Sequence, residues 1–463
     1  MNNSTTVSTR SSVLRRSFRK EFPAAVRGEG AYVWDAAGHR YLDLAGSAAV
    51  NFIGHGVAEI SAAMAEQAAR LEFVHTSQFT TPIAEEYAHE LLAFAGDHFR
   101  DGAVYFTCGG SESIETALKL ARQYQVEIGQ TRRYQILSRH QSYHGSTLGA
   151  LSVSGNKRRR EIYLPMVREF PHIDMPYCYR CAFDCTDGCR NCGQQYAAEL
   201  ETAIEASNGE AAALIFEPVS GATLGAVVPP PGYLQSVAEI CRRHHVLLIA
   251  DEVMTGMGRT GRNFAVEHFS GEQGHVKPDI LVTAKGLSSG YAPLGAVIAS
   301  KKVIDAIAAG SGAFLHGFTY NAHPISLAAG RAVLHRLQSH KLVEAADSSR
   351  AGTPAAYFKK GLETLRNVET VGDIHGIGLL WGMEFVADKA SKRPSAPEQN
   401  FAGRVGAAAL QRGLLVYPMQ GCVDGTAGDH LLLAPPAVIT QEQIGWSINQ
   451  LSAAIMEARG QLS

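Results

Sequence analysis

The sequence predicts an α/β protein in which a large domain with a mostly parallel sheet is joined to a smaller α+β domain. Between about residue 85 and residue 330, short and continuously apolar segments alternate with helical stretches, as in a parallel sheet that is covered on both faces. After residue 330 the pattern changes to mixed helices and strands with a Gly- and Pro-rich stretch. The length of 463 residues and the apolar fraction of 46% suffice for two or three domains.

The individual elements follow from local patterns along the chain. Residues 31–44 alternate apolar and polar side chains around a turn, which predicts a hairpin, and the Ala-rich residues 60–71 predict a helix. The strands of the large sheet are expected at 103–107, 134–139, 211–216, 246–250, 280–283 and 294–299. Helices are expected at about 112–125, 232–244 and 328–337, followed by strands near 376–385 and the Gly- and Pro-rich stretch 413–436.

These patterns predict four consecutive parts. Residues 1–20 form a flexible arm, 21–70 the N-terminal part of the small domain, 71–330 the large domain and 331–463 the rest of the small domain. The arm has five basic and no acidic residues, which also fits an organelle transit peptide. No apolar signal peptide precedes it, so we expect a cytoplasmic protein, or one of an organelle matrix if the arm is a transit peptide.

Charge and hydropathy exclude two classes of partner. Lys and Arg number 42 and Asp and Glu number 44, so the net charge is −2, and without a long basic stretch a nucleic-acid partner is disfavoured. The longest apolar runs have about five residues, whereas a membrane span needs about 20. These observations favour a globular protein with a small-molecule ligand, and the size fits an enzyme.

Two polar residues follow buried strands where ligands of open α/β sheets bind. Asp251 ends the apolar run 246–250, and Lys285 follows the run 280–282. Desolvation at such a position lowers the pKa of a lysine and frees its amine to attack a carbonyl group. A Schiff-base lysine and an acid that pairs with a heteroaromatic nitrogen are what pyridoxal phosphate requires.

The other parts of a pyridoxal phosphate site are also present in the sequence. The turn Gly109-Gly110-Ser111 between a strand and a helix offers backbone N–H groups and a hydroxyl to a phosphate. Tyr143 and Val253 could lie against the two faces of the cofactor ring.

The order of motifs resembles that of the class III (omega-amino acid type) pyridoxal-phosphate-dependent aminotransferases, from about residue 28 to residue 455. The matching segments are Phe106-Thr-Cys-Gly-Gly-Ser-Glu-Ser113, Ser142-Tyr-His-Gly145, Phe216-Glu-Pro-Val219, Asp251-Glu-Val253, Gly258-Arg-Thr-Gly261, Ala284-Lys-Gly-Leu287, Pro293-Leu-Gly-Ala-Val297, Gly317-Phe-Thr-Tyr320 and His323-Pro324. The resemblance implies fold type I, the aspartate-aminotransferase-like fold.

The resemblance also implies roles for individual residues. Lys285 holds the cofactor as a Schiff base and moves the substrate proton, and Asp251 keeps the pyridine nitrogen protonated. Thr319 of a neighbouring subunit helps to bind the phosphate, so the active site lies in a homodimer interface. The implied catalytic residues are Lys285, Asp251 and Tyr143, and the implied cofactor-binding residues are Gly110, Ser111, Tyr143, His144, Glu217, Asp251, Val253, Lys285 and Thr319.

The implied reaction is a ping-pong transfer of an amino group to a 2-oxo acid such as pyruvate or 2-oxoglutarate. Tyr417 and Pro418 stand where the family frequently has a substrate-carboxylate arginine, and the segment 46–49 is small where relatives often have bulky pocket residues. Both departures favour an amine or omega-amino donor and a roomy pocket.

Two other functions remain open. A racemase or aminomutase would use the same lysine and cofactor. The second open function is that of a non-catalytic nucleotide-binding α/β protein. It is suggested by the segment Gly256-Met-Gly-Arg-Thr-Gly261, which matches the dinucleotide fingerprint G-x-G-x-x-G. That segment does not open a helix directly after the first strand of a βαβ unit, which the fingerprint requires.

The cysteines are the one feature that this function leaves unexplained. Five of the eight lie between residues 178 and 192, within an insertion at about 174–195, and two Cys-x-x-Cys pairs are separated by seven residues. The pairs Cys178, Cys181 and Cys189, Cys192 can supply tetrahedral ligands to a structural zinc ion, although the spacer is shorter than in usual zinc ribbons. The alternative is a loop of reduced, buried thiols. Neither alternative gives a metal a part in catalysis.

Overall fold

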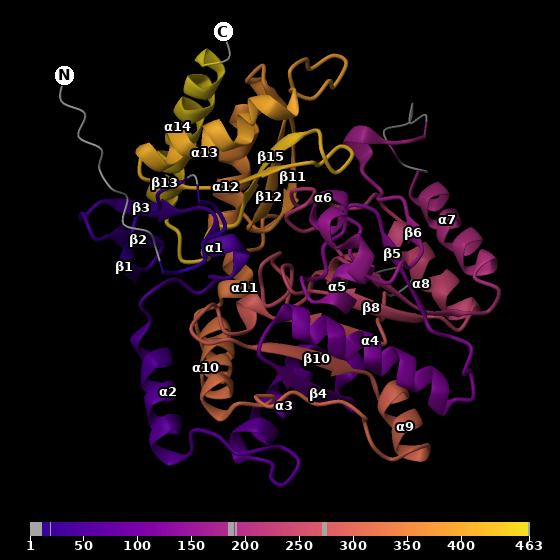
Figure 1. The fold of residues 1–463 in the computed structure, drawn as a ribbon. Coiled ribbons are helices and arrows are strands. Elements are labelled where there is room, and N and C mark those ends of the chain that lie inside the picture. Colours follow the sequence, from indigo (N-terminus) through magenta and orange to yellow (C-terminus); the bar gives the residue numbers. More distant parts are fainter. Residues whose placement is uncertain (1–11, 19, 184–188, 190–191, 271–275, 462–463) are drawn as a thin grey trace.

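The computed structural model describes residues 12–18, 20–183, 189, 192–270 and 276–461, and a seven-stranded sheet forms its centre (Figure 1). Its strand order is β4-β10-β9-β8-β7-β5-β6, and β10 is antiparallel to both of its neighbours while the other pairs are parallel. The strands are β4 (Ala103–Thr107), β5 (Gln135–Arg139), β6 (His172–Ile173), β7 (Ala211–Phe216), β8 (Leu247–Asp251), β9 (Ile280–Thr283) and β10 (Gly295–Ala299). The predicted α/β class is confirmed.

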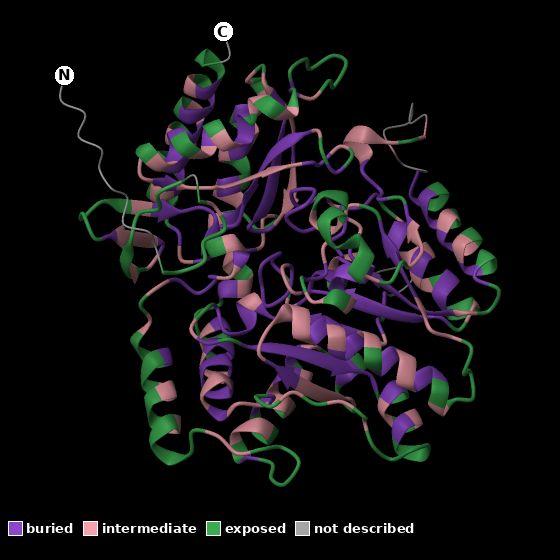
Figure 2. Ribbon diagram, in the orientation of Figure 1, coloured by how far each residue is buried: buried purple, intermediate pink, exposed green. Residues whose placement is uncertain are grey.

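Successive side chains of the central strands enter two different cores, because a strand turns alternate residues to opposite faces. In β8, Leu247 and Ile249 pack in one cluster, whereas Leu248 and Ala250 pack in the other. The strands are accordingly buried along their length, as Figure 2 shows for the centre of the molecule. The continuously apolar runs in the sequence reflect this burial on both sides.

Helices supply the other half of each core. One face carries α4 (Gly110–Glu127), α5 (Leu148–Val153) and α9 (Lys301–Ala309). The opposite face carries α3 (Pro82–Phe94), α7 (Cys192–Ala206), α8 (Tyr233–Arg243) and α10 (Pro324–Ser339). The helices predicted at 112–125, 232–244 and 328–337 correspond to α4, α8 and α10.

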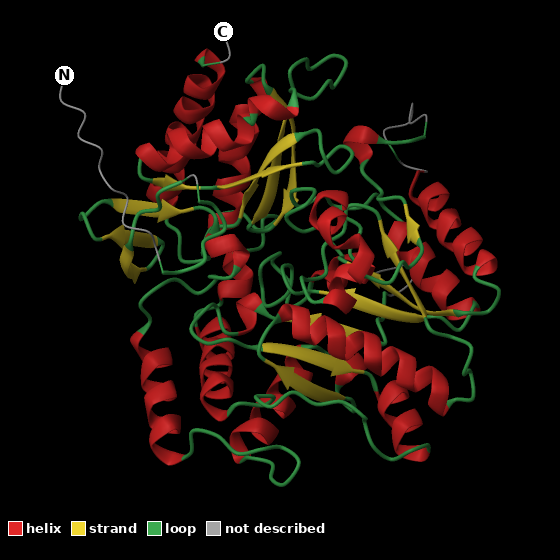
Figure 3. Ribbon diagram, in the orientation of Figure 1, coloured by secondary structure: helices red, strands yellow, loops and turns green. Residues whose placement is uncertain are grey.

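Two further sheets form the smaller part of the molecule (Figure 3). One has the order β1-β2-β3-β13, from β1 (Ala25–Glu29), β2 (Tyr32–Asp35), β3 (Arg40–Asp43) and β13 (Leu414–Leu415). The other is antiparallel with the order β11-β12-β15-β14, from β11 (Val371–Ile377), β12 (Leu380–Phe385), β14 (Tyr417–Gln420) and β15 (Asp429–Leu433). Strand β13 pairs with β3, so both ends of the chain share one sheet.

Helices α12 (Pro354–Glu363) and α13 (Phe401–Gln411) both pack against α14 (Gln441–Gly460), and α13 also packs against β13, β14 and β15. Helix α14 begins with a capping box in which the Thr440 hydroxyl accepts from the backbone of Gln443, and the Gln443 side chain accepts from the backbone of Thr440. The predicted hairpin at 31–44 is β2 and β3, and the helix at 60–71 is α2 (Ala58–Arg70). Helix α10 crosses the predicted domain boundary at residue 330, and the four-part division stays a prediction.

The remaining short helices are α1 (Gly46–Ala49), α6 (Lys157–Arg160) and α11 (Leu342–Ala345). Most of the predicted N-terminal arm, residues 1–11 and 19, lies outside the described residues. Of the helices that the structure describes, none combines the length and the apolar character that crossing a bilayer demands.

Candidate functional site

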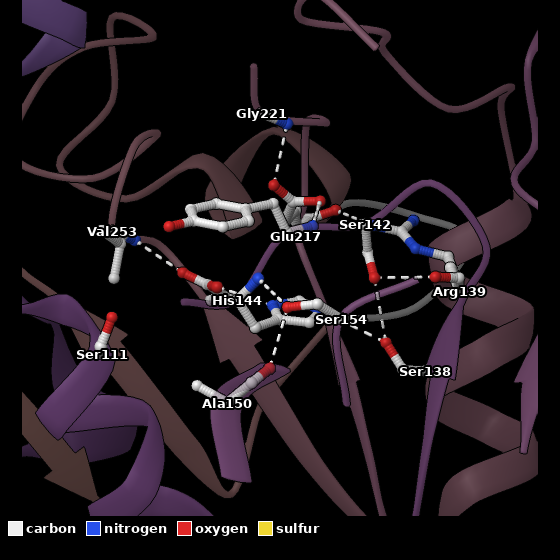
Figure 4. A network of polar contacts seen from close by, with 12 residues as sticks. Ser111, Ser138, Arg139, Ser142, His144, Ala150, Ser154, Glu217, Gly221 and Val253 are labelled. Carbon is white, nitrogen blue, oxygen red and sulfur yellow. Dashed lines mark hydrogen bonds and ion pairs between the residues drawn. The ribbon is translucent and has the colours of Figure 1, made fainter. Parts of the chain in front are cut away.

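The carboxyl ends of β4, β7, β8 and β9 open into a cavity of about 450 Å³. Eight of the nine residues with an implied cofactor role line it, namely Gly110, Ser111, Tyr143, His144, Glu217, Asp251, Val253 and Lys285. The volume lies in the range of small-molecule and cofactor sites. Figure 4 shows how several of the polar side chains around it are linked by hydrogen bonds.

Asp251 is the last residue of β8, and its carboxylate is almost completely buried. One oxygen, Oδ2, lies 2.7 Å from Nδ1 of His144, and the other, Oδ1, accepts from the backbone N–H of Val253 at 3.0 Å. His144 is held in turn, because its backbone N–H donates to Ser154 and its Nε2 lies 3.2 Å from the Ser138 hydroxyl. The position of the carboxylate is therefore fixed by the protein alone.

Lys285 follows β9 at the start of a short 3₁₀ helix, and its backbone has a positive φ of 44°. Burial lowers the pKa of its ammonium to about 8, while the carboxylates of Asp251 and Glu217 act in the opposite direction. The guanidinium groups of Arg259 and Arg159 lower this pKa further. At pH 7, about a tenth of Lys285 is therefore an uncharged nucleophile, far more than an exposed lysine would provide.

Glu217 follows β7 and lies between the cavity and the buried Arg139. Its Oε1 accepts from the backbone N–H of Gly221 at 2.9 Å, and its Oε2 from that of Tyr143 at 3.4 Å. Its backbone carbonyl accepts from the Arg139 guanidinium. Burial is the main reason that the pKa of the Glu217 carboxyl is raised, and Asp251 raises it further.

The start of α4 forms a cradle for an anion. Its first residues have no side-chain cap, so their N–H groups are available to a ligand. A Cβ on Gly110 would lie 3.0 Å from Cγ1 of Val253, and a Cβ on Gly145 would lie 2.6 Å from the Ser111 hydroxyl oxygen. The missing side chains at Gly110 and Gly145 thus keep the cradle open, and a phosphate group fits there.

Arg159 is a residue near the site that the sequence motifs did not identify. Its guanidinium carbon lies 4.3 Å from the centroid of the Tyr143 ring, a cation–π contact. No carboxylate among the described residues lies within ion-pair distance of it, so its charge remains available to an anion. In the sequence Arg159 belongs to a run of four basic residues, 157–160, and such runs are typical of solvent-exposed segments, so the sequence alone does not single it out.

Thr319 is the implied cofactor residue that does not line the cavity. It lies in an exposed stretch of the chain between α9 and α10. This placement is compatible with the expectation that Thr319 acts on the site of a neighbouring subunit, and that expectation stays a prediction.

The small residues of 46–49 do not line the cavity, although Val50 does. A Cβ on Gly46 would lie 2.2 Å from the carbonyl oxygen of Ala434, and Ala49 packs in an apolar cluster that Tyr417 borders. Gly46 and Ala49 are thus explained by close packing against the C-terminal part of the chain, whereas Ser47 is exposed. They do not argue for a roomy pocket.

The dinucleotide-like segment Gly256–Gly261 forms turns and opens no helix. Its Arg259 is buried and donates to the carbonyl groups of Asn51, Ala434 and Pro435. Arg259 thereby ties the two ends of the chain to the central part, which gives this segment a structural explanation.

Comparisons with known proteins agree with this arrangement. The family model for aminotransferase class-III matches residues 16–455. An uncharacterized aminotransferase of Bacillus subtilis is 39% identical over 96% of this chain and 97% of its own length. An uncharacterized aminotransferase of Schizosaccharomyces pombe is 37% identical over 94% of this chain and 92% of its own length.

Solved structures of transaminases share the fold. An (S)-enantioselective omega-transaminase from Thermomicrobium roseum superposes with a TM-score of 0.86 at 37% identity, over 95% of this chain and 93% of that chain. Together with the mostly parallel sheet, this likeness identifies fold type I. Because the family model and the relatives span nearly the whole chain, this protein belongs to the class-III aminotransferases and is an aminotransferase.

Proposed function

We propose that this aminotransferase binds pyridoxal phosphate through Lys285 and transfers an amino group from an amine or omega-amino donor to a 2-oxo acid. The observation that carries the proposal is the convergence of Lys285, Asp251 and the open start of α4 on one cavity. Bound pyridoxal phosphate supplies an aldehyde for amines and an electron-withdrawing ring that stabilises a carbanion.

The residues around the cavity divide the binding of the cofactor among them. Gly110 and Ser111 bind the phosphate at the N-terminus of α4, with Thr319 of a second subunit in a homodimer. Tyr143 and Val253 flank the ring, and Asp251 pairs with the ring nitrogen. His144 and the Val253 N–H hold the Asp251 carboxylate in its orientation through the two hydrogen bonds described above.

Lys285 acts as the nucleophile and as the proton carrier of the reaction. Its lowered pKa leaves Nζ partly unprotonated, so the amine could attack a carbonyl group with loss of water. Once an incoming substrate amine has displaced Nζ from that carbon, the freed amine could accept a proton from the substrate carbon and return it. Glu217 is a buried carboxyl that positions the backbone of Tyr143.

Arg159 is the residue that we assign to the carboxylate of the 2-oxo acid. It is a cation beside Tyr143 with no carboxylate partner among the described residues, and a guanidinium binds a carboxylate with two hydrogen bonds. Position 417 carries a tyrosine, so an arginine at 159 supplies the charge from another direction.

A half-reaction assay tests the proposal. Purified protein is incubated with pyridoxal phosphate and then with single amines in the absence of acceptor. We expect the yellow colour to be lost in step with release of a carbonyl product, and pyruvate or 2-oxoglutarate to restore it. A protein that stays colourless with added cofactor contradicts the cofactor assignment.

The same assay separates the rival function on this scaffold. A racemase or aminomutase inverts or isomerises an amine without consuming a stoichiometric amount of 2-oxo acid.

Light scattering tests the homodimer, which has twice the 49.7 kDa of the chain. A cofactor-loaded monomer with full activity would refute the role of Thr319.

A further inference from the structure

The cysteine-rich loop between β6 and α7 brings three thiols together at a distance from the cavity just described. The Sγ atoms of Cys178, Cys189 and Cys192 all lie within 4.8 Å of one another. Four sulfur atoms bound to one zinc ion at about 2.3 Å are roughly 3.8 Å apart, so a small contraction converts this group into a ligand set. None of the three lines the cavity at the strand ends.

We propose that Cys178, Cys181, Cys189 and Cys192 bind one structural zinc ion that fastens this loop to the start of α7. The four residues form two Cys-x-x-Cys pairs, and three of their sulfur atoms already face one point. Thiolates prefer zinc among the common divalent ions, and four of them satisfy its tetrahedral geometry without an open position for catalysis.

Cys181 is the fourth ligand. Its sulfur accepts a weak hydrogen bond from the Tyr196 hydroxyl at 3.8 Å, and Tyr196 itself lies on the first turns of α7. The backbone N–H of Ala182 donates to the same hydroxyl at 2.9 Å. Tyr196 thus keeps Cys181 beside the other thiols and remains available to bind the coordinated sulfur, as residues around metal ligands commonly do.

Burial and backbone geometry fit a structural site. Cys192 is buried, and Cys178, Cys181 and Cys189 are partly buried against the main hydrophobic core. Cys189 has a positive φ of 64°, which residues with a side chain adopt uncommonly. A bond from the Cys189 sulfur to a metal ion would help to hold this conformation.

The site has a definite place in the fold. The residues beside Cys178 contact the buried Glu384 of β12, to which Tyr177 donates at 2.5 Å and Arg180 at 2.7 Å. On the other side, Cys192 begins α7, which covers the central sheet. Zinc would therefore connect the small part of the molecule to the large part through this loop.

Metal analysis of the protein, loaded with pyridoxal phosphate and carrying no histidine tag, tests the proposal. We expect about one zinc ion per chain in the wild type and at least a tenfold loss in Cys178→Ser and Cys192→Ser. Cys241→Ser is the matched control, because Cys241 is also buried but lies on α8 outside the cluster, and it should retain the zinc.

A second measurement on the wild type covers the case in which the variants fail to fold. A mercurial reagent that titrates thiols should release zinc in proportion to the cysteines modified, and replacement by cobalt should give the intense sulfur-to-cobalt absorption of a four-thiolate site. A wild type without metal, or a disulfide within the cluster, would overturn the proposal. Neither readout depends on the colour or turnover of the aminotransferase, so the two proposals fail independently.

Discussion

Lys285, Asp251 and Glu217 reach their cavity from the ends of three different strands, whereas Cys178, Cys189 and Cys192 come from 15 consecutive residues that end at the start of α7. The parallel register of β7, β8 and β9 holds the first group in place through backbone hydrogen bonds and buried side chains. Among the described residues between β6 and the start of α7, the structure has a short 3₁₀ helix at residues 178–180. A site on a sheet is thus positioned before any ligand binds, while a site on a loop depends on its ligand for order.

This difference predicts that some substitutions abolish aminotransferase activity without removing zinc, and that others remove zinc and lower stability without removing the cofactor. Changes at the strand ends should remove activity and leave the zinc content intact. Changes in the cysteine cluster should remove zinc and lower the melting temperature while the cofactor colour persists.

Lys285→Ala is expected to have the largest effect. Without the nucleophile and proton carrier, kcat/KM should fall on the order of 10³-fold or more. Lys277→Ala removes an exposed lysine outside the cavity and is the control. Steady-state kinetics with metal analysis of both variants makes the measurement, and an active Lys285→Ala enzyme would show that another group holds the cofactor.

Asp251→Asn keeps the shape of the buried side chain but removes its charge. We expect kcat to fall on the order of 10²-fold, because a neutral amide does not keep the ring nitrogen of the cofactor protonated. The exposed Asp101→Asn is the matched control. If Asp251→Asn lost activity only through unfolding, its melting temperature would fall with kcat, and the electrostatic role would be wrong.

Arg159→Leu tests the assignment of the acceptor carboxylate. Loss of a charge-assisted hydrogen bond should raise KM for the 2-oxo acid about tenfold and leave the half-reaction with a carboxylate-free amine unchanged. Arg158→Leu, one residue away and bonded to the partly buried side chain of Gln420, should change neither. An equal rise in KM for both substrates would place Arg159 outside the acceptor site.

The pH dependence of cofactor uptake is expected to be the smallest effect. Because the pKa of Lys285 is lowered to about 8, the rate at which cofactor-free protein takes up pyridoxal phosphate should rise with pH up to about 8 and then level off. In Asp251→Asn the plateau should begin at a lower pH, because the Asp251 carboxylate raises this pKa. Stopped-flow absorbance measures the rate, and a profile that rises only above pH 10 would contradict the burial of the amine.

The same shift has a consequence for stability. Between about pH 8 and the ordinary pKa of 10.5, the unfolded chain binds more protons at this lysine than the folded chain does. The stability of the cofactor-free protein should therefore rise with pH across this window.

Much of the fold follows from local sequence patterns. The apolar runs predicted as strands correspond to β4, β5, β7, β8, β9 and β10, because burial on both faces leaves an unmistakable pattern. Strands such as β13 and β14 are short or half exposed, and neither shows that pattern. Their pairing with β3 and β15 joins distant segments, which local periodicity cannot reveal.

The sequence by itself determined the class of fold, the family and the residues at the strand ends, because each depends on which side chains follow which apolar run. Only the tertiary structure decided that His144 orients Asp251, that Arg159 lies over the Tyr143 ring and that Gly46 and Ala49 serve packing. It also showed that Cys178 meets Cys189 and Cys192 more closely than their spacing alone could establish. These are distances between side chains from separate elements, and they exist only once the register of the sheet and the path of the loop are fixed.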